Sequence, residues 1–417
     1  MEKYVIEGGH KLHGEIPVYG AKNEALKIIA ASVLLEGKCT IKNIPEIEDI
    51  NRLVEILEDL GAKVERNGHE ITIDPQSINK TKPSDDLVHK LRSSVMLAGP
   101  LLAHYGKVTM AHPGGCVIGQ RPIDMFLSGF KAMGAKVEEN DHEYTLQAKK
   151  LHGAKIVMPW VMVTATESLM MTACLAEGTT TIINAAMEPE IPALADFLNS
   201  CGAKISGAGT PIITIEGVEK LSGGECTIIP DRIEAGTFAI MGLITGSEIT
   251  VTGCEPKHLE TVLETLRRAN AKLEVGDNWI KTKPSKLKAV ELRTHEYPGF
   301  PTDLQSPFTI LMTQAEGMSL IHEAIYEGRL FYTDKLNAMG AKIIMCDPHR
   351  VIVSGPTPLI AKKLESPDLR AGMGLVLAGL VAEGKTVIDN IYQIERGYEN
   401  PIARLQALGA KIEKIKE

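Results

Sequence analysis

INRLVEILEDLGAKV, residues 50–64, is an amphipathic stretch followed by a Gly-Ala-Lys turn, and variants of this turn recur along the whole chain. Its apolar residues return every three to four positions, which predicts a helix with one buried face. Glycine directly after such a helix favours the left-handed conformation that ends it. The equivalent positions are Gly61, Gly134, Gly202, Asn270, Gly340 and Gly409. Their separations of 73, 68, 68, 70 and 69 residues are too regular for chance and predict six repeats.

A second marker recurs in step with the first. An apolar stretch ends in glycine and leads into a short strand-like segment, as in LLEGKCTIKN and VAEGKTVIDN. The marker glycines are Gly37, Gly106, Gly178, Gly246, Gly317 and Gly384. Each repeat therefore predicts an apolar helix with a glycine C-cap, a strand, a loop, an amphipathic helix and a β-hairpin. A repeat of about 70 residues buries little surface alone, so we expect an α/β fold whose helices share interiors in two groups of three repeats.

Composition indicates a globular protein with aliphatic cores. The chain has 417 residues, of which 44% are hydrophobic but only 4% aromatic. A net charge of −8 without a Lys/Arg block argues against a nucleic-acid partner. The N-terminal stretch MEKYVIEGGHKLHGE lacks the apolar core of a signal peptide, and the apolar run at 371–382 is too short to span a membrane. We therefore expect a soluble, cytoplasmic protein without a membrane span.

The stretch HPGGCVIGQRPID, residues 112–124, places one cysteine in unusual surroundings. Cys116 lies between a Gly-Gly pair and a Gly-x-Arg-Pro turn that contains Arg121. From the marker glycine to the Gly-Ala-Lys position the second repeat spans 28 residues, whereas the other repeats span 23 to 25. The extra residues lie in this loop. An enlarged loop on a repeated scaffold favours a functional role over a surface turn with an incidental thiol.

The other cysteines carry no comparable signal. The chain has seven cysteines, none in a CxxC pair, so neither a disulfide framework nor a zinc site is predicted. Most lie in apolar runs and are expected to be buried core residues. We expect no metal ion and no cofactor.

Several cationic residues lie at predicted helix starts or in loops. GAKNEAL and PDRIEAG are typical of helix N-termini, whose free N–H groups favour anions. If the cations converge on one cleft, they form a pocket for a small anion that bears phosphate and carboxylate groups. For any one of them alone, an ordinary solvated charge is the simpler interpretation. The candidates are Lys22, Arg92, Arg121, Arg329, Arg370 and Arg396.

Six motifs occur in an order that is typical of one enzyme family. They are GAKNEAL, GGCVIGQRPID, PDRIEAG, GFPTDLQSPF, IYEGRL and IERGYE. On these motifs the chain resembles the UDP-N-acetylglucosamine 1-carboxyvinyltransferase (UDP-GlcNAc enolpyruvyl transferase) family over residues 1–417. The resemblance implies the inside-out α/β barrel of the enolpyruvyl transferase fold, with two domains of three repeats each. It also implies a discontinuous domain, 1–21 and 230–417, with both termini, and an inserted domain, 22–229, that carries the Cys116 loop.

The resemblance implies an activity as well. Members of this family transfer the enolpyruvyl group of phosphoenolpyruvate to the 3′-hydroxyl of UDP-GlcNAc and release phosphate, the first committed step of peptidoglycan synthesis. Cys116 matches the general acid, which also forms an adduct with phosphoenolpyruvate, and Asp303 matches the base. The implied catalytic residues are Cys116, Asp303, Lys22 and Arg396. The implied substrate contacts are Lys22, Asn23, Arg92, Arg121, Pro122, Ile123, Asp124, Met125, Val163, Asp303, Ile325, Arg329, Arg370 and Arg396.

The chain departs from the family on the nucleotide side of the site. Where the family usually has a lysine and small residues, this chain has PWVMVTATES, with Trp160, Met162 and Thr164. A family arginine is replaced by Met187, and a common histidine by Phe126. Losing a cation and a hydroxyl removes phosphate contacts, so a paralogous enzyme with a modified or different acceptor is the alternative.

Two further alternatives are less favoured. The shikimate-pathway relative, 5-enolpyruvylshikimate-3-phosphate synthase, shares the fold but has no catalytic cysteine in this loop. A nucleotide-binding pseudoenzyme would not need Cys116, Asp303 and the arginines together.

Overall fold

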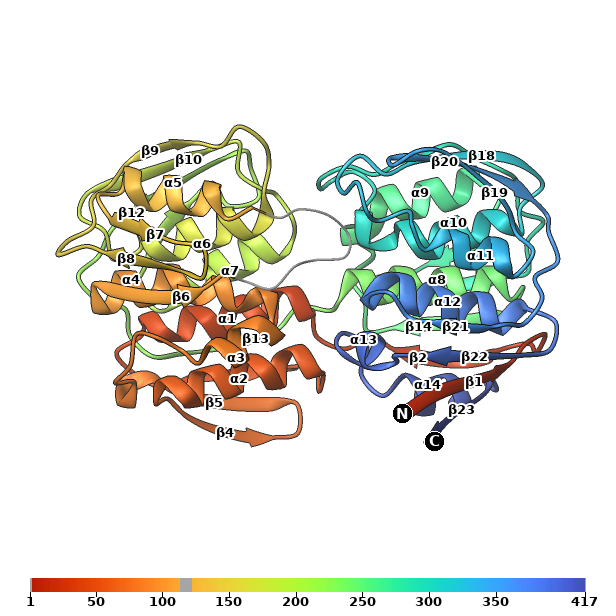
Figure 1. Cartoon of the computed structure of the whole chain (residues 1–417), viewed down its shortest axis with the longest axis horizontal. Helices are drawn as coiled ribbons and strands as arrows, with labels where there is room; N and C mark the ends of the chain where they lie inside the picture. The colour runs from red at the N-terminus through yellow and green to blue at the C-terminus, as the bar shows by residue number, and fades with distance from the viewer. Residues whose placement is uncertain (1, 113–121, 417) are drawn as a thin grey trace. The chain divides into compact units, whose positions relative to one another are not determined.

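The computed structural model describes residues 2–112 and 122–416, which form two compact units (Figure 1). We call residues 2–19 and 230–416 the terminal unit, and residues 20–112 and 122–229 the central unit. The chain thus passes from one unit to the other between Tyr19 and Gly20, and returns between Ile229 and Pro230.

The elements of the central unit follow three repeats. The first contains α1 (Lys22–Ala31), η1 (Ser32–Leu34), β3 (Cys39–Lys42), α2 (Glu48–Leu60), β4 (Lys63–Asn67), β5 (Glu70–Asp74) and η2 (Pro75–Ser77). The second contains α3 (Asp85–Lys90), η3 (Arg92–Leu97), α4 (Ala98–Tyr105), β6 (Lys107–Ala111), α5 (Asp124–Ala132), β7 (Lys136–Glu139) and β8 (Glu143–Gln147). The third contains β9 (Lys155–Val157), α6 (Val163–Ala173), β10 (Thr179–Ile183), α7 (Glu190–Ser200), β11 (Lys204–Ser206), β12 (Ile212–Glu216) and β13 (Gly224–Thr227).

The terminal unit has the same plan. Its first repeat contains β2 (His13–Pro17), α8 (Arg232–Ile244), β14 (Glu248–Thr252), η4 (Pro256–Leu259), α9 (Glu260–Arg268), β15 (Lys272–Val275) and β16 (Trp279–Lys283). The second contains β17 (Leu292–Arg293), η5 (Thr302–Leu304), α10 (Gln305–Thr313), β18 (Gly317–His322), α11 (Thr333–Ala338), β19 (Lys342–Asp347) and β20 (Arg350–Gly355). The third contains β21 (Lys363–Glu365), α12 (Leu369–Val381), β22 (Lys385–Asp389), α13 (Tyr392–Glu395), α14 (Pro401–Ala407), β23 (Lys411–Lys416) and β1 (Glu2–Glu7).

The described strands form six small sheets with one pairing pattern. In five of them, the strand after the marker glycine pairs antiparallel with a hairpin strand, as β3 pairs with β5 and β10 with β12; in the sixth, β22 pairs antiparallel with β1. In five of the sheets a parallel strand flanks the marker strand, as β13 flanks β3. The last sheet is completed by the N-terminal strand, because β1 lies between β22 and β23. Both chain ends therefore lie in one sheet (Figure 1).

The repeated Gly-Ala-Lys position adopts the left-handed conformation in every repeat. φ is +107° at Gly61, +94° at Gly134, +106° at Gly202, +63° at Asn270, +97° at Gly340 and +94° at Gly409. Asparagine is the side-chain-bearing residue that tolerates this region best. The substitution of Asn for Gly in the fourth repeat therefore preserves the turn.

The predicted glycine C-caps are only partly right. Gly106 is the C-cap of α4, and Gly246 directly follows the C-cap residue of α8. By contrast, α6 ends at Ala173, before Gly178, whose φ of +87° turns the chain into β10. The first helix, α1, is continued by η1 and ends well before Gly37.

In the same way, α10 ends at Thr313, before Gly317, and α12 ends at Val381, before Gly384. In these four repeats the glycine precedes or begins the strand and does not cap the helix.

The apolar helices lie inside their units, and the sheets lie outside them (Figure 1). Every residue of α8 and α10 is buried, and these two helices pack on each other and on α12. In the central unit α4 packs on α6 and on η1. A helix that is apolar on all sides is stable only in an interior. Each unit has its own hydrophobic core, and the predicted inside-out α/β barrel is confirmed. None of the described helices is long and apolar enough to cross a membrane.

Candidate active site

Asp303 lies between two arginines of the terminal unit. It belongs to the turn η5, directly before the buried helix α10. Nη1 of Arg329 donates to Oδ1 of Asp303 at 2.8 Å, and Nε of Arg370 donates to Oδ2 at 3.1 Å. Arg329 and Arg370 are only 6% and 5% exposed. Each carboxylate oxygen therefore has its own buried guanidinium partner, and the three side chains form one charged cluster.

The two arginines retain donors that no described residue uses. Among residues 2–112 and 122–416, Nε of Arg329 and Nη1 of Arg370 have no hydrogen-bond partner. Burial disfavours the charge on Arg329, but Asp303 and Glu323 outweigh it and raise its pKa. Burial opposes the charge on Arg370 as well, but Tyr398 and Asp303 raise its pKa. A buried cationic donor without an acceptor costs free energy, so the cluster is suited to bind a phosphate or carboxylate group that accepts from these donors.

A second carboxylate, Glu323, supports this cluster from behind. It is fully buried and accepts hydrogen bonds from the backbone N–H groups of Ile325 and Tyr326 at 2.9 and 3.2 Å. Its other oxygen accepts from the Thr302 hydroxyl at 2.8 Å. That hydroxyl in turn accepts from Nη1 of Arg329 at 3.0 Å. Glu323 thus fixes both the loop that contains Ile325 and the position of Arg329, a role that sequence reasoning missed.

Arg370 is placed by the start of α12. The side chain of Asp368 caps this helix and accepts from the N–H of Arg370 at 2.8 Å. The guanidinium of Arg370 lies 5.5 Å from the ring centroid of Tyr398, within the range of a cation–π contact. Arg396 follows α13 as its C-cap residue, and its Nη1 donates to Gln393 at 3.0 Å. The IERGYE motif therefore contributes both Arg396 and the ring that packs on Arg370.

The predicted helix starts at GAKNEAL and PDRIEAG are confirmed. Lys22 is the first residue of α1, and Asn23 the second. The Lys22 ammonium lies 2.7 Å from the buried carboxylate of Asp49. A charged partner at this distance fixes the direction of the lysine side chain. Arg92 is the first residue of the turn η3 and is half-buried.

The predicted nucleotide contacts lie at the starts of two other helices of the central unit. Pro122 and Ile123 lead into α5, which begins with Asp124 and Met125; Ile123 and Met125 are buried, whereas Pro122 and Asp124 are exposed. Val163 is the first residue of α6. Just before it, Trp160 is 54% exposed, so the bulky residue of the altered PWVMVTATES stretch projects toward solvent within its unit.

The structure shows contacts among only some of the predicted site residues. It brings Asp303, Arg329 and Arg370 into direct contact and places Ile325 on the loop that Glu323 anchors. The remaining described candidates are distributed over the two units. Cys116 and Arg121 lie outside the described residues.

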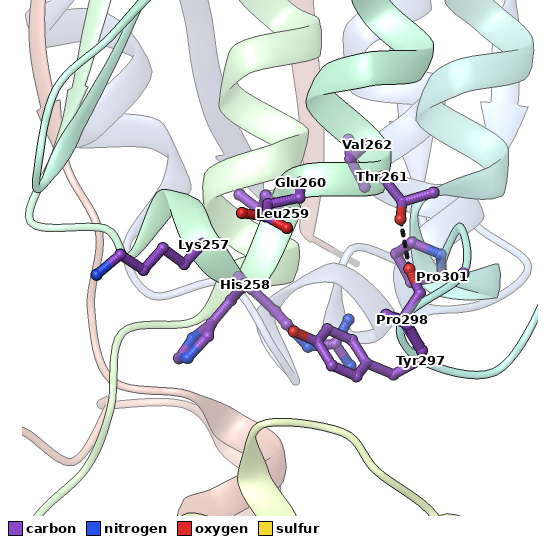
Figure 2. A pocket seen from close by; sticks show the side chains of 11 residues that line it. Lys257, His258, Leu259, Glu260, Thr261, Val262, Tyr297, Pro298 and Pro301 are labelled. Carbon is purple, nitrogen blue, oxygen red and sulfur yellow. Dashed lines mark hydrogen bonds between the residues drawn. The ribbon is translucent and has the colours of Figure 1, made fainter. Parts of the chain in front are cut away.

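A small cavity in the terminal unit does not coincide with these residues. Figure 2 shows Lys257 and His258 of η4 on one side of it and Tyr297 and Pro298 on the other. The cavity volume is about 40 Å³. None of the predicted site residues lines it, so this cavity is not the candidate active site.

The fold and the arginine cluster together define the class of protein. The sequence matches the profile of the EPSP synthase (3-phosphoshikimate 1-carboxyvinyltransferase) family over residues 6–405. The enolpyruvyl transferase NikO from Streptomyces tendae has the same fold, with a TM-score of 0.91 and 25% identity over 100% of this chain and 99% of that one. EPSP synthase from Acinetobacter baumannii aligns over the full length of both chains with a TM-score of 0.76 and 19% identity. The protein is thus an enolpyruvyl transferase.

Sequence relatives give the particular family. A UDP-N-acetylglucosamine 1-carboxyvinyltransferase from Desulfatibacillum aliphaticivorans is 45% identical over 100% of both chains. UDP-N-acetylglucosamine 1-carboxyvinyltransferase 1 from Carboxydothermus hydrogenoformans is 45% identical over 100% of this chain and 99% of its own. The chain belongs to the UDP-N-acetylglucosamine 1-carboxyvinyltransferase family, as its motifs predicted.

Proposed function

We propose that the protein transfers the enolpyruvyl group of phosphoenolpyruvate to the 3′-hydroxyl of UDP-GlcNAc and releases phosphate. This reaction is the first committed step of peptidoglycan synthesis, and we propose that it takes place in the cytoplasm. The single observation that carries the proposal is the Asp303–Arg329–Arg370 cluster, which joins a carboxylate base to buried cations with donors to spare. Full-length relatives at 42–45% identity share one name, which favours UDP-GlcNAc over a modified acceptor.

The proposed reaction has two steps. First, the Cys116 thiol gives a proton to C3 of phosphoenolpyruvate while the acceptor oxygen bonds to C2, and Asp303 takes the proton of the acceptor hydroxyl. Then the bond from C2 to the phosphate oxygen breaks and phosphate leaves with the proton that Asp303 had taken, while C3 returns a proton to the Cys116 thiolate, which restores the double bond and both catalytic groups. We propose that the incoming anion draws an arginine donor away from Asp303, because it offers more negative charge than the carboxylate, and that this increases the proton affinity of Asp303.

The remaining predicted contacts divide between the two substrates. We propose that Lys22, Arg121 and Arg396 grip the phosphate and carboxylate of phosphoenolpyruvate, with help from Arg92, Arg329 and Arg370. The proposed contacts to UDP-GlcNAc are Asn23, Arg121, Pro122, Ile123, Asp124, Met125, Val163, Asp303 and Ile325. Asp49 of α2 pairs with the ammonium of Lys22 at the start of α1, which holds this cation in place.

A phosphate-release assay tests the proposed function. Purified, folded protein is expected to release phosphate from phosphoenolpyruvate only when UDP-GlcNAc is present. One control omits UDP-GlcNAc, and a matched control replaces it with UDP-glucose, which lacks the acetamido group. An absence of phosphate release with UDP-GlcNAc would contradict the proposal.

Intact-mass measurement tests the role of Cys116. Addition of the thiol sulfur to C2, with the thiol proton moved to C3, increases the protein mass by that of a whole phosphoenolpyruvate molecule. We expect this adduct in the wild type and not in Cys116→Ser. Cys346→Ser is the control, because Cys346 is a free, exposed cysteine. An adduct that persists in Cys116→Ser would show that another cysteine reacts.

A further inference from the structure

Where the chain enters the central unit, the start of α1 forms two hydrogen bonds with Ile229. The N–H of Ala21 donates to the carbonyl oxygen of Ile229 at 2.7 Å. The N–H of Ile229 donates to Oε2 of Glu24 at 2.8 Å. Both polar groups of Ile229, the last residue of the central unit, are therefore bound by the start of α1.

The crossover of the terminal unit repeats this arrangement. The N–H of Asp231 donates to the carbonyl oxygen of Tyr19 at 2.9 Å, and the N–H of Tyr19 donates to Oε2 of Glu234 at 3.0 Å. Glu24 and Glu234 are each the third residue of their helices, α1 and α8. A glutamate at this position usually reaches back to its own helix start. Here each one holds the neighbouring crossover segment, and we call the two side chains the crossover carboxyls.

The terminal crossover carboxyl is paired with a cation. Glu234 forms a bidentate ion pair with Arg404, with distances of 2.6 and 3.1 Å. Arg404 is 8% exposed, and its guanidinium lies 4.5 Å from the ring centroid of Tyr19. Removing the charge of Glu234 would leave a buried guanidinium uncompensated, which is strongly destabilising.

The central crossover carboxyl has different surroundings. Glu24 is 2% exposed, and the ionisable groups that act on it are two further carboxyls, Glu190 and Glu167. The neighbouring cation, Lys27, lies 3.3 Å from Glu167. Burial, together with these carboxyls, raises the pKa of Glu24 to about 8, against the opposing effect of the Ile229 N–H. Near pH 7 a neutral carboxyl group therefore accepts the hydrogen bond from Ile229.

We propose that Glu24 is a positioning residue for enolpyruvyl transfer, whose acceptor oxygen, and not its negative charge, holds the first turn of α1 against Ile229. That turn begins with Lys22 and Asn23, which immediately precede Glu24. The inference rests on the proposed function, in which these two residues contact the substrates. A displacement of about 1 Å at a substrate-binding group can cost about 100-fold in rate.

Three variants test the inference. Glu24→Gln keeps an acceptor oxygen of the same reach, so kcat/KM is expected to stay within about threefold of the wild type, since one neutral hydrogen bond replaces another. Glu24→Ala removes the acceptor and is expected to lower kcat/KM by about 10- to 100-fold, with a rise in KM for phosphoenolpyruvate, because Lys22 loses its position. The matched control, Glu234→Gln, carries the same substitution at the other crossover and is expected to lower the melting temperature, because Arg404 loses its counter-ion.

Amide hydrogen exchange gives a readout independent of turnover. The Ile229 amide is expected to be protected in the wild type and in Glu24→Gln, and to exchange faster in Glu24→Ala. A folded Glu24→Ala protein with wild-type kcat/KM would overturn the inference. Equal losses in Glu24→Gln and Glu24→Ala would show that the charge is required, which also overturns it. If the wild type itself shows no transfer, the proposed function fails, while the exchange rates still decide whether Glu24 holds Ile229.

Discussion

Asp303 accepts one hydrogen bond from each of two buried arginines, so replacing one of its oxygens disturbs the cluster and the proposed base together. In Asp303→Asn the amide nitrogen has to face a guanidinium N–H, and the side chain can no longer accept a proton from the acceptor hydroxyl. We expect kcat to fall by about 100- to 10,000-fold, the usual contribution of a general base. The measurement is phosphate release under saturating substrates, with the exposed Asp277→Asn as the control. A loss of less than tenfold would exclude Asp303 as the base.

Glu323 gives a second prediction at the residue scale. Its Oε1 accepts from the Thr294 hydroxyl and from two backbone N–H groups, and its Oε2 accepts from the Thr302 hydroxyl. In Glu323→Gln an NH2 group replaces one of these acceptors, so the Thr302 hydroxyl loses the acceptor for its proton. We expect the free energy of unfolding to fall by about 1–3 kcal/mol, the cost of a buried unsatisfied polar group. Urea denaturation measures this, and kcat/KM should fall as well because Arg329 loses its support through Thr302. The same substitution at the exposed Glu316, in the same part of the chain, should change neither quantity.

The sequence identified the proposed site residues, but not the residues that hold them in place. Asp303, Arg329 and Arg370 stood out because they lie in recognisable motifs, but Glu323 lies at the end of a repeat marker and gave no signal of its own. A repeated asparagine was overlooked in the same way. Asn43, Asn184 and Asn390 end their markers with positive φ, and each donates from its side chain to a backbone carbonyl. Comparing the last residue of every marker would have found them, because few residues other than glycine tolerate this conformation.

At the scale of elements, the buried carboxyls of α1 and α6 make stability depend on pH. Burial raises the pKa of Glu24 to about 8, and burial with neighbouring carboxyls raises that of Glu167 although Lys27 opposes it. The folded protein thus retains protons that the unfolded chain releases above the ordinary value of 4.5. This stabilisation is complete below about pH 4.5 and is lost as the pH rises through about 8.

Glu24→Gln tests this pH dependence because the amide does not titrate. The melting temperature of the variant minus that of the wild type is expected to increase from pH 5 to pH 8 and then level off. Each group that titrates in this way changes the free energy of unfolding by at most about 1.4 kcal/mol per pH unit. Differential scanning calorimetry at matched ionic strength measures the difference, with the exposed Glu65→Gln as the control. A difference that stays constant with pH would mean that Glu24 ionises equally in the folded and unfolded chains.

The helices and strands were largely predictable, because the repeat period gave the same order of helix, strand and hairpin six times along the chain. The helix ends were less so. Glycine was expected to end each apolar helix, but α1, α6, α10 and α12 end before their marker glycines. Glycine tolerates a left-handed turn wherever the chain needs one, so its presence shows that a turn exists and not which element it ends.

At the scale of the whole molecule, the repeat count predicted two groups of three repeats but not how the last group closes. The final hairpin strand, β23, pairs with β1 from the other end of the chain. Nothing in residues 2–7 marks them as the missing strand of the sixth repeat, because their partner lies about 400 residues away and short-range pattern contains no information on such pairing. The pairing also means that the terminal unit cannot be complete until the last strand is present.

Two separate cores imply two separable unfolding events. Leu57 and Leu336 are fully buried, the first in the core of the central unit and the second in the core of the terminal unit. Because each unit buries its own apolar helices, we expect calorimetry of the substrate-free protein to deviate from a two-state transition. Leu57→Ala should lower one component and Leu336→Ala the other, each by about 2–5 kcal/mol, the usual cost of such a cavity. UDP-GlcNAc at 100 times its Kd should stabilise the folded protein by about 2.7 kcal/mol. A single common transition that both variants shift equally would contradict this prediction.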